Sequence, residues 1–308
     1  MFNEAREDTK DTHKDMDSMK KILLSSAALV AFAGSALAAD LPSRKAPVAP
    51  PAPVPMWTGF YAGLNAGYNW GTNSNARSTV YAVSGTGAPV VDAGAVMSGS
   101  QAVTQSGFIG GAQFGYNYQG FMWQNLVLGL ETDISGTGIR GNTYTRGYST
   151  LGTSMSNGAT TFNAGLDYLG TVRGRVGYLW TPTLLMYGTA GFAYGGAYAN
   201  LGQTAYQATT GSNNTWAGAG RQNQLLTGWT AGGGVEWMFL PNWTLKGEAL
   251  YWDLGNMNIN TVGNGIYGNG ATAGYANGTG SVNYQGVKAV AGINYHFTWG
   301  AAPVVAKY

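Results

Sequence analysis

Apolar and polar residues alternate along eight segments of the chain that follow Trp57. In the first segment the apolar residues Phe60, Leu64 and Trp70 fall at even positions, and small or polar residues fill the odd positions between them. Successive side chains of a β-strand point to opposite faces, so a period of two predicts strands with one apolar face. The predicted strands cover residues 60–70, 108–118, 126–135, 168–178, 184–194, 229–239, 243–251 and 287–297, and the fifth is ambiguous in its facing.

The connections between these segments alternate in length. The short ones cover residues 120–125, 181–183 and 240–242, and the long ones cover residues 71–106, 136–165, 195–223 and 255–283. Outer-membrane β-barrels combine short periplasmic turns with long outer loops. We therefore expect both termini in the periplasm. Because the long segments are rich in Gly, Asn, Ser, Thr and Ala, we expect them to form mobile loops on the cell surface.

No window after Trp57 is apolar over the roughly 18 residues that a transmembrane helix needs, whereas a barrel strand crosses with about 9 to 11 alternating residues. The pattern predicts an all-β fold, an eight-stranded antiparallel up-and-down transmembrane β-barrel over residues 57–298. Aromatic side chains near the strand ends predict the two interfacial girdles of such a barrel. These residues are Trp57, Tyr68, Trp70, Tyr178, Trp229, Trp237, Trp243 and Tyr251.

The N-terminal part of the chain has the features of a secretory signal peptide. Met19 is followed by two lysines, an apolar run from Ile22 and small residues that precede a cleavage site before Ala39. The apolar run is too short for a membrane-spanning helix. We expect a signal peptide over residues 19–38 and interpret residues 1–18 as a non-native upstream extension. The proline-rich residues 39–56 predict an extended periplasmic spacer that could contact the peptidoglycan side.

Charged residues on the predicted lumen face are balanced, with four acids and four bases. They are Glu131, Asp133, Arg173, Arg175, Glu236, Lys246, Glu248 and Lys288. An unpaired buried ion costs several kcal/mol, so we expect these side chains to pair, with Glu131 and Asp133 meeting the arginines of the next strand. A structural network is favoured, because the interior of an eight-stranded barrel is just wide enough to be filled by side chains. A gating or selectivity role is the alternative.

Composition excludes several other classes of protein. Charged residues make up 10% of the chain and aromatic residues 13%, a combination that suits neither a soluble domain, with roughly 25% charged residues, nor a disordered chain. The net charge of +2, without a basic cluster, argues against nucleic acid, and the absence of cysteine excludes disulfides and thiolate metal sites. His296 has no nucleophile or orienting acid spaced beside it. We therefore expect no enzyme activity, cofactor or metal.

Several motifs in order along the chain resemble one family. They are WTGFYAG (57–63), GFIGGAQ (107–113), GTVRGRVGY (170–178), GWTAGGGVEW (228–237), PNW (241–243), LYWDLG (250–255) and GINYHF (292–297). Together they resemble the porin-like outer-membrane proteins of rhizobia and brucellae, the Omp25/Omp31 group. The resemblance implies an eight-stranded barrel that supports envelope integrity, in a group described as porins, surface antigens or haem binders. Haem binding is not carried over, because no loop histidine could serve as an axial ligand.

Two functions are compatible with the sequence, and a third is disfavoured. The first is an integral outer-membrane barrel that supports the envelope, with at most porin-like passage of small solutes, and the second is an adhesin or ligand receptor acting through its outer loops. A soluble lipocalin-like barrel, the third, would turn its apolar face inward, where this chain carries charges. Expected partners are outer-membrane lipid, lipopolysaccharide and the barrel-assembly machinery. That machinery favours a terminal aromatic residue; because residues 299–308 extend past Phe297, either Phe297 or Tyr308 could serve.

Overall fold

The computed structural model describes residues 57–72, 75–84, 96–151, 154–209, 212–268, 270 and 272–297. The predicted upstream extension, signal peptide, spacer and C-terminal tail lie outside the described residues. The described strands are β1 (Gly59–Gly71), β2 (Asn75–Ser84), β3 (Gly99–Ala102), β4 (Gly107–Gln119), β5 (Leu126–Leu151), β6 (Ser154–Thr181), β7 (Leu184–Thr209), β8 (Ser212–Leu240), β9 (Trp243–Tyr267) and β10 (Thr272–Phe297). No helix in this part of the chain combines the length and the hydropathy needed to cross a membrane.

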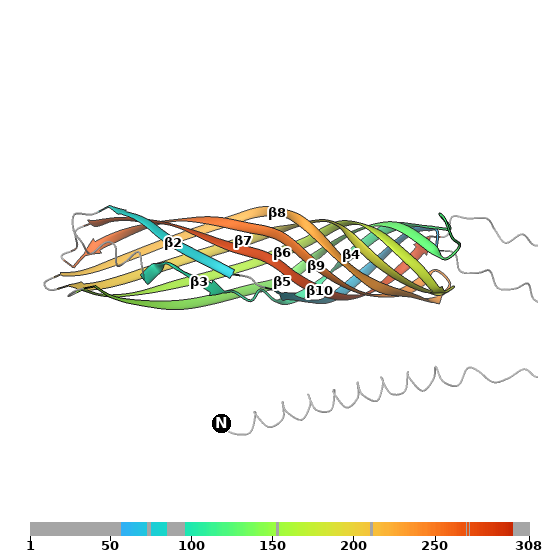
Figure 1. Ribbon diagram of the computed structural model, residues 1–308, viewed down its shortest axis with the longest axis horizontal. Coiled ribbons are helices and arrows are strands. Elements are labelled where there is room, and N and C mark those ends of the chain that lie inside the picture. Colours follow the sequence, from blue (N-terminus) through green and yellow to red (C-terminus); the bar gives the residue numbers. More distant parts are fainter. Residues whose placement is uncertain are drawn as a thin grey trace, which may run out of the picture. The chain divides into compact units, whose positions relative to one another are not determined.

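Strand β1 closes a ring by pairing with both β4 and β10. Phe60 lies opposite Tyr116 on β4 and opposite Phe297 on β10. Eight strands follow one another around the ring in the order β1, β4, β5, β6, β7, β8, β9, β10, each antiparallel to its neighbours, and they wind obliquely around one long barrel (Figure 1). The predicted eight-stranded antiparallel up-and-down barrel is confirmed.

The two ends of the barrel differ, and we name them by their connections. At the turn end, the strands are joined by the short segments 120–125, 182–183 and 241–242. The last turn places Asn242 at φ 69°, a left-handed conformation that Asn tolerates better than most residues. At the hairpin end, β5 is followed by β6, β7 by β8, and β9 by β10.

The expectation of long mobile loops over residues 136–165, 195–223 and 255–283 is wrong for the described residues of these segments. They continue the strands: β5 and β6 pair as far as Leu151 opposite Ser154, and β7 and β8 as far as Thr209 opposite Ser212. The resulting strands contain 25 to 29 residues, whereas a strand of about 9 to 11 residues is long enough to cross a membrane. The barrel wall therefore extends well beyond the membrane.

The outer segments were predicted as loops because the two faces of the sheet exchange their character along the barrel. In the half nearer the turn end, apolar residues such as Leu130 and Val176 point outward and are 67% and 57% exposed. In the half nearer the hairpin end many buried inward side chains are apolar, among them Phe162, Leu201 and Ile259, beside polar ones such as Gln203 and Gln207. A search for strands with apolar outer faces misses a segment whose outer face is mostly polar.

The segment 71–106 also contributes to the extended wall. β2 pairs with the outer part of β10, with Thr79 opposite Thr279, and thus continues the position that β1 holds nearer the turn end. β3 pairs with β2, and a single bridge joins Ser106 to Arg140 on β5. This long connection therefore also contains two strands among its described residues.

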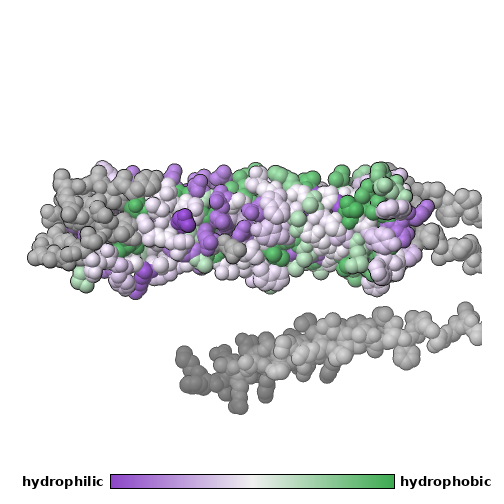
Figure 2. All heavy atoms as spheres, viewed as in Figure 1, coloured by the Kyte–Doolittle hydropathy of each residue, from purple (hydrophilic) through white to green (hydrophobic). Residues whose placement is uncertain are grey.

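Buried side chains fill the barrel in layers along its axis. Nearest the turn end is an apolar cluster of Trp57, Val127, Leu179, Leu185, Tyr187 and Met238. A charged layer follows, and beyond it a larger apolar cluster that includes Phe162, Leu166, Trp252, Leu254, Met257 and Tyr284. On the face drawn in Figure 2, hydrophobic residues gather nearer the turn end, where the outer face of the strands is apolar.

Candidate functional site

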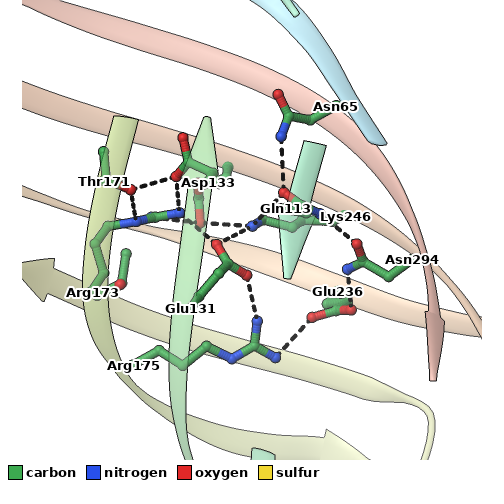
Figure 3. A network of polar contacts seen from close by, with 12 residues as sticks. Asn65, Gln113, Glu131, Asp133, Thr171, Arg173, Arg175, Glu236, Lys246 and Asn294 are labelled. Carbon is green, nitrogen blue, oxygen red and sulfur yellow. Dashed lines mark hydrogen bonds and ion pairs between the residues drawn. The ribbon is translucent and has the colours of Figure 1, made fainter. Parts of the chain in front are cut away.

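The eight charged residues predicted to face the lumen form the central layer of the barrel. They come from β5, β6, β8, β9 and β10, and none of their side chains is more than 3% exposed. Their positions follow from strand register: Glu131 lies opposite Arg173, and Glu236 lies opposite Lys246. The structure thus brings all eight into one network. Figure 3 shows the part of it around Glu131, Arg173 and Arg175.

Arg173 contacts three carboxylates. Its Nη2 lies 2.5 Å from Glu131 Oε1 and 3.0 Å from Asp133 Oδ2, and its Nη1 lies 3.0 Å from Glu248 Oε2. Thr171 donates to Asp133 and accepts from Arg173 Nε, which fixes the guanidinium plane. One arginine therefore joins acids from β5 and β9.

Arg175 joins the other side of the network. Its Nη2 lies 2.9 Å from Glu236 Oε2 and its Nη1 lies 3.3 Å from Glu131 Oε2. The guanidinium carbon lies 5.0 Å from the ring centre of Tyr61 and 4.8 Å from that of Tyr187, within the range of a cation–π contact. Arg175 is held by two carboxylates and two aromatic rings.

The lysines complete the pairing. Lys246 Nζ lies 2.6 Å from Glu131 Oε1 and 3.2 Å from Glu248 Oε2, and Lys288 Nζ lies 3.0 Å from Asp133 Oδ1. Each of the eight charges therefore has a partner of opposite sign. Such pairing is what makes burial of ions tolerable in a medium of low dielectric constant.

Neutral polar residues that the sequence did not single out as a site belong to the same layer. Tyr61 Oη donates to Glu131 at 2.6 Å, and Tyr187 Oη donates to Glu248 at 2.9 Å. Asn294 Nδ2 donates to Glu236 at 2.7 Å and its Oδ1 accepts from Gln113 (Figure 3). The sequence could have indicated them, because these four residues occupy inward positions of the alternating pattern on β1, β7, β4 and β10.

His296 also lies in the lumen, beside the network. Its Nε2 lies 3.3 Å from Glu236 Oε1 and 3.4 Å from Thr244 Oγ1, and its ring stacks on Tyr61. Its backbone N–H donates to the carbonyl of Asn242 in the last turn. The histidine is thus a member of the packed lumen layer, held by Glu236, Thr244 and two aromatic rings.

Seven of the eight predicted girdle residues lie on the outer face in two belts. Tyr178, Trp237 and Trp243 are near the turn end, while Tyr68, Trp70, Trp229 and Tyr251 lie near Phe108 and Phe192 in a belt closer to the hairpins. On β1, Phe60 and Trp70 are about 33 Å apart along the strand, or about 25 Å along the axis at a tilt of about 40°. That spacing matches the apolar band of an outer-membrane barrel.

Trp57 is the exception, and its assignment to the girdle is wrong. Its side chain is fully buried at the turn end, where Nε1 donates to the carbonyl of Pro182 at 3.0 Å. The ring packs edge-on against His296 with centroids 5.5 Å apart. Trp57 precedes β1, so the strand alternation did not constrain where its side chain points.

The network neutralises charge and fills the lumen. Among the described residues no group of three or more His, Cys, Asp or Glu could hold a metal ion. A Cβ built on Gly115 would lie 2.4 Å from Tyr61 Cζ, which shows how closely this layer is packed. The arrangement suits a rigid structural layer.

Comparisons with solved structures return outer-membrane proteins at low similarity. OprG of Pseudomonas aeruginosa is 12% identical, with 79% of this chain and 99% of that chain covered and a TM-score of 0.37. Ail of Yersinia pestis is 11% identical, with 76% and 99% covered and a TM-score of 0.24. These likenesses are too weak to support an inference about function.

Curated relatives are much more similar, although no family model matches the chain. The 31 kDa outer-membrane immunogenic protein of Brucella melitensis is 36% identical over 287 residues, which cover 91% of this chain and 100% of that protein. The 25 kDa outer-membrane immunogenic protein of Brucella abortus is 30% identical over 251 residues, or 80% of this chain and 91% of that protein. This chain is therefore an outer-membrane β-barrel protein that belongs to the family of the Brucella 31 kDa and 25 kDa outer-membrane immunogenic proteins.

Proposed function

We propose that this protein is a non-conducting structural barrel that supports the integrity of the cell envelope. The observation that carries the proposal is the charged layer, in which eight ionised side chains meet across the lumen and none is more than 3% exposed. A solute crossing this layer would have to break buried ion pairs. Removing one partner of such a pair costs about 3–5 kcal/mol.

The apolar layers on either side of the network also support a closed lumen over porin-like passage. The cluster around Trp57 lies between the network and the turn end, and the cluster around Trp252 and Phe162 lies between the network and the hairpin end. Hydrated ions would lose water against the apolar side chains of both layers. The proposal assigns no catalytic step to the protein.

Conductance in a planar lipid bilayer tests this proposal. We expect the refolded protein to insert without steady current under conditions in which a general porin, added to the same bilayer, conducts. Steady conductance that changes in the pair Glu131→Arg and Arg173→Glu would show a hydrated lumen and refute the structural role. In a strain that lacks the gene, expression of the non-conducting protein should restore resistance to detergent. Failure to restore it would refute the envelope role.

Partner binding at the hairpin end is a second candidate, favoured by large apolar side chains on the outer wall. Tyr148 on β5 is 76% exposed and Met155 on β6 is 66% exposed, and an exposed apolar patch beyond a membrane is a candidate contact surface. The variant Tyr148→Ser with Met155→Ser should then lose adhesion to host cells while detergent resistance is kept. Unchanged adhesion would exclude this surface.

A further inference from the structure

A shallow groove crosses the outer surface of the extended wall, between the outer aromatic belt and the hairpin tips. Its floor consists of directly opposed residues, Thr161 on β6, Gly202 on β7 and Ala219 on β8. Two hollows of about 530 and 470 Å³ share these three residues and form one continuous groove. Their size is within the range of ligand sites.

One wall of the groove is part of a row of amide side chains that ends in an arginine, and Asn163, Asn200 and Arg221 of this row line the groove. Asn142, Asn163, Asn200 and Arg221 lie opposite one another in turn on β5, β6, β7 and β8. Asn142, Asn163 and Arg221 are exposed and Asn200 is half-buried. Within the described part of the chain these four side chains make no hydrogen bond or ion pair with protein groups, so their donors and acceptors are available.

Further amides adjoin this row where β8 and β9 separate. The ladder between these strands is interrupted from Ala219 to Trp229 on β8. Gln222 and Gln224 fall on inward positions of β8 but are exposed in this gap. The wall therefore presents a polar surface, rich in side-chain and backbone hydrogen-bonding groups, with one unpaired cation in Arg221.

The height of the groove limits what can reach it. Arg221 is eight positions from Trp229 of the outer belt on the same strand, which corresponds to about 26 Å along the strand and about 20 Å along the axis. Phospholipid headgroups extend only about 5–8 Å beyond the hydrocarbon. A phospholipid of the surrounding membrane is too short, whereas the sugar chain of an outer-leaflet glycolipid spans this height.

The geometry points to a site for the core oligosaccharide of lipopolysaccharide on this groove. Planar amides donate to and accept from adjacent sugar hydroxyls, and the Arg221 fork suits a phosphate or carboxylate on an acidic core sugar. The groove opens sideways from the wall, toward neighbouring glycolipids. This inference rests on the proposed envelope role and names the partner through which the extended wall would act.

Unfolding temperature in three kinds of phospholipid vesicle tests the site: vesicles with no glycolipid, with lipid A, and with rough lipopolysaccharide, which is lipid A plus core. A ligand of the folded state raises its unfolding temperature. We expect rough lipopolysaccharide to raise it beyond lipid A. Arg221→Ala and Asn200→Ala should lose that additional rise and bind labelled, delipidated core oligosaccharide about tenfold more weakly.

Two exposed residues outside the groove provide matched controls, Arg77 on β2 and Asn157 on β6. Arg77→Ala and Asn157→Ala should bind the core oligosaccharide as the unchanged protein does. Equal effects of lipid A and rough lipopolysaccharide, equal losses in groove and control variants, or equal binding of dextran would each overturn the inference. Conductance of the same preparations separates the two claims, because a silent barrel without core binding refutes only the glycolipid site.

Discussion

Glu131 and Arg173 lie directly opposite each other on β5 and β6, and their side chains form an ion pair of 2.5 Å at the centre of the lumen. Glu131 also contacts Arg175 at 3.3 Å and Lys246 at 2.6 Å. One carboxylate thus serves three of the four cations in the layer. The balance of charge in the lumen depends on it more than on any other acid of the network.

Neutralising Glu131 should therefore destabilise the barrel strongly. In Glu131→Gln three buried cations lose a shared counter-charge, and we expect a loss of about 3–5 kcal/mol in the free energy of unfolding. Urea unfolding in phospholipid vesicles measures it. Asp167→Asn is the matched control, because Asp167 pairs with Arg140 at the surface, where such a pair contributes about 0–1 kcal/mol. Similar losses in both variants would contradict the central role of Glu131.

Lys288 and Asp133 should behave as a coupled pair. Lys288 pairs only with Asp133 among the described residues, at 3.0 Å. We expect Lys288→Met combined with Asp133→Asn to lose less stability than the two single losses added, by about 0.5–3 kcal/mol. A double-mutant cycle by urea unfolding measures this coupling. Strict additivity would show that the two side chains do not interact.

Truncation of Trp57 should weaken the turn end. The side chain is fully buried, so Trp57→Ala leaves a cavity in its apolar cluster, and a loss of about 3–5 kcal/mol is expected. Trp70→Ala is a suitable comparison because Trp70 is 49% exposed on the outer face. The result would be reversed, with Trp70→Ala the more harmful, if Trp57 belonged to the lipid-facing girdle.

A methyl group at Gly115 should disturb the network through Tyr61. The added Cβ would lie 2.4 Å from Tyr61 Cζ, so the ring must move away from Glu131 and Arg175, at about 1–3 kcal/mol. At Gly136 the nearest atom to an added Cβ is 3.9 Å away. Unfolding of Gly115→Ala and Gly136→Ala should thus differ, and equal stabilities would show that the lumen has room to spare.

Hydrogen exchange distinguishes extended strands from loops at the hairpin end. Backbone amides of residues 142–151 and 154–163 pair across β5 and β6, so we expect slow exchange there, close to that of the membrane half. Mass spectrometry of exchanged protein in vesicles gives the rates by segment. Exchange as fast as that of an unstructured peptide would restore the original expectation of mobile loops.

The membrane half of the barrel was predictable because one physical rule applies throughout it. Lipid demands apolar outward residues, so Phe60, Leu130 and Val176 defined the strands and placed Glu131 and Arg173 inside. Simple adjacency of consecutive strands then predicted which acids and bases meet. Strand register, which sequence does not give, decided that Glu131 contacts Lys246 across the lumen.

The outer half was not predictable from the same rule, because water replaces lipid outside the wall. There the apolar residues turn inward, as Phe162 and Ile259 do, and Asn, Thr and Gly on the outer face suggest loops when read alone. The buried position of the Trp57 side chain was not predicted, for a different reason. It lies outside the strand alternation, and only the packing around Pro182 and His296 fixes its position.

The continuous outer strands also determine which residues an antibody can contact at the same time. On the wall, residues such as Asn163, Asn200 and Arg221 are neighbours although they are far apart in the chain, while residues adjacent in sequence face opposite ways. An antibody against the folded protein would therefore recognise a discontinuous epitope drawn from several strands. Linear peptides copied from residues 136–165 or 195–223 would present half of their side chains from the hidden interior.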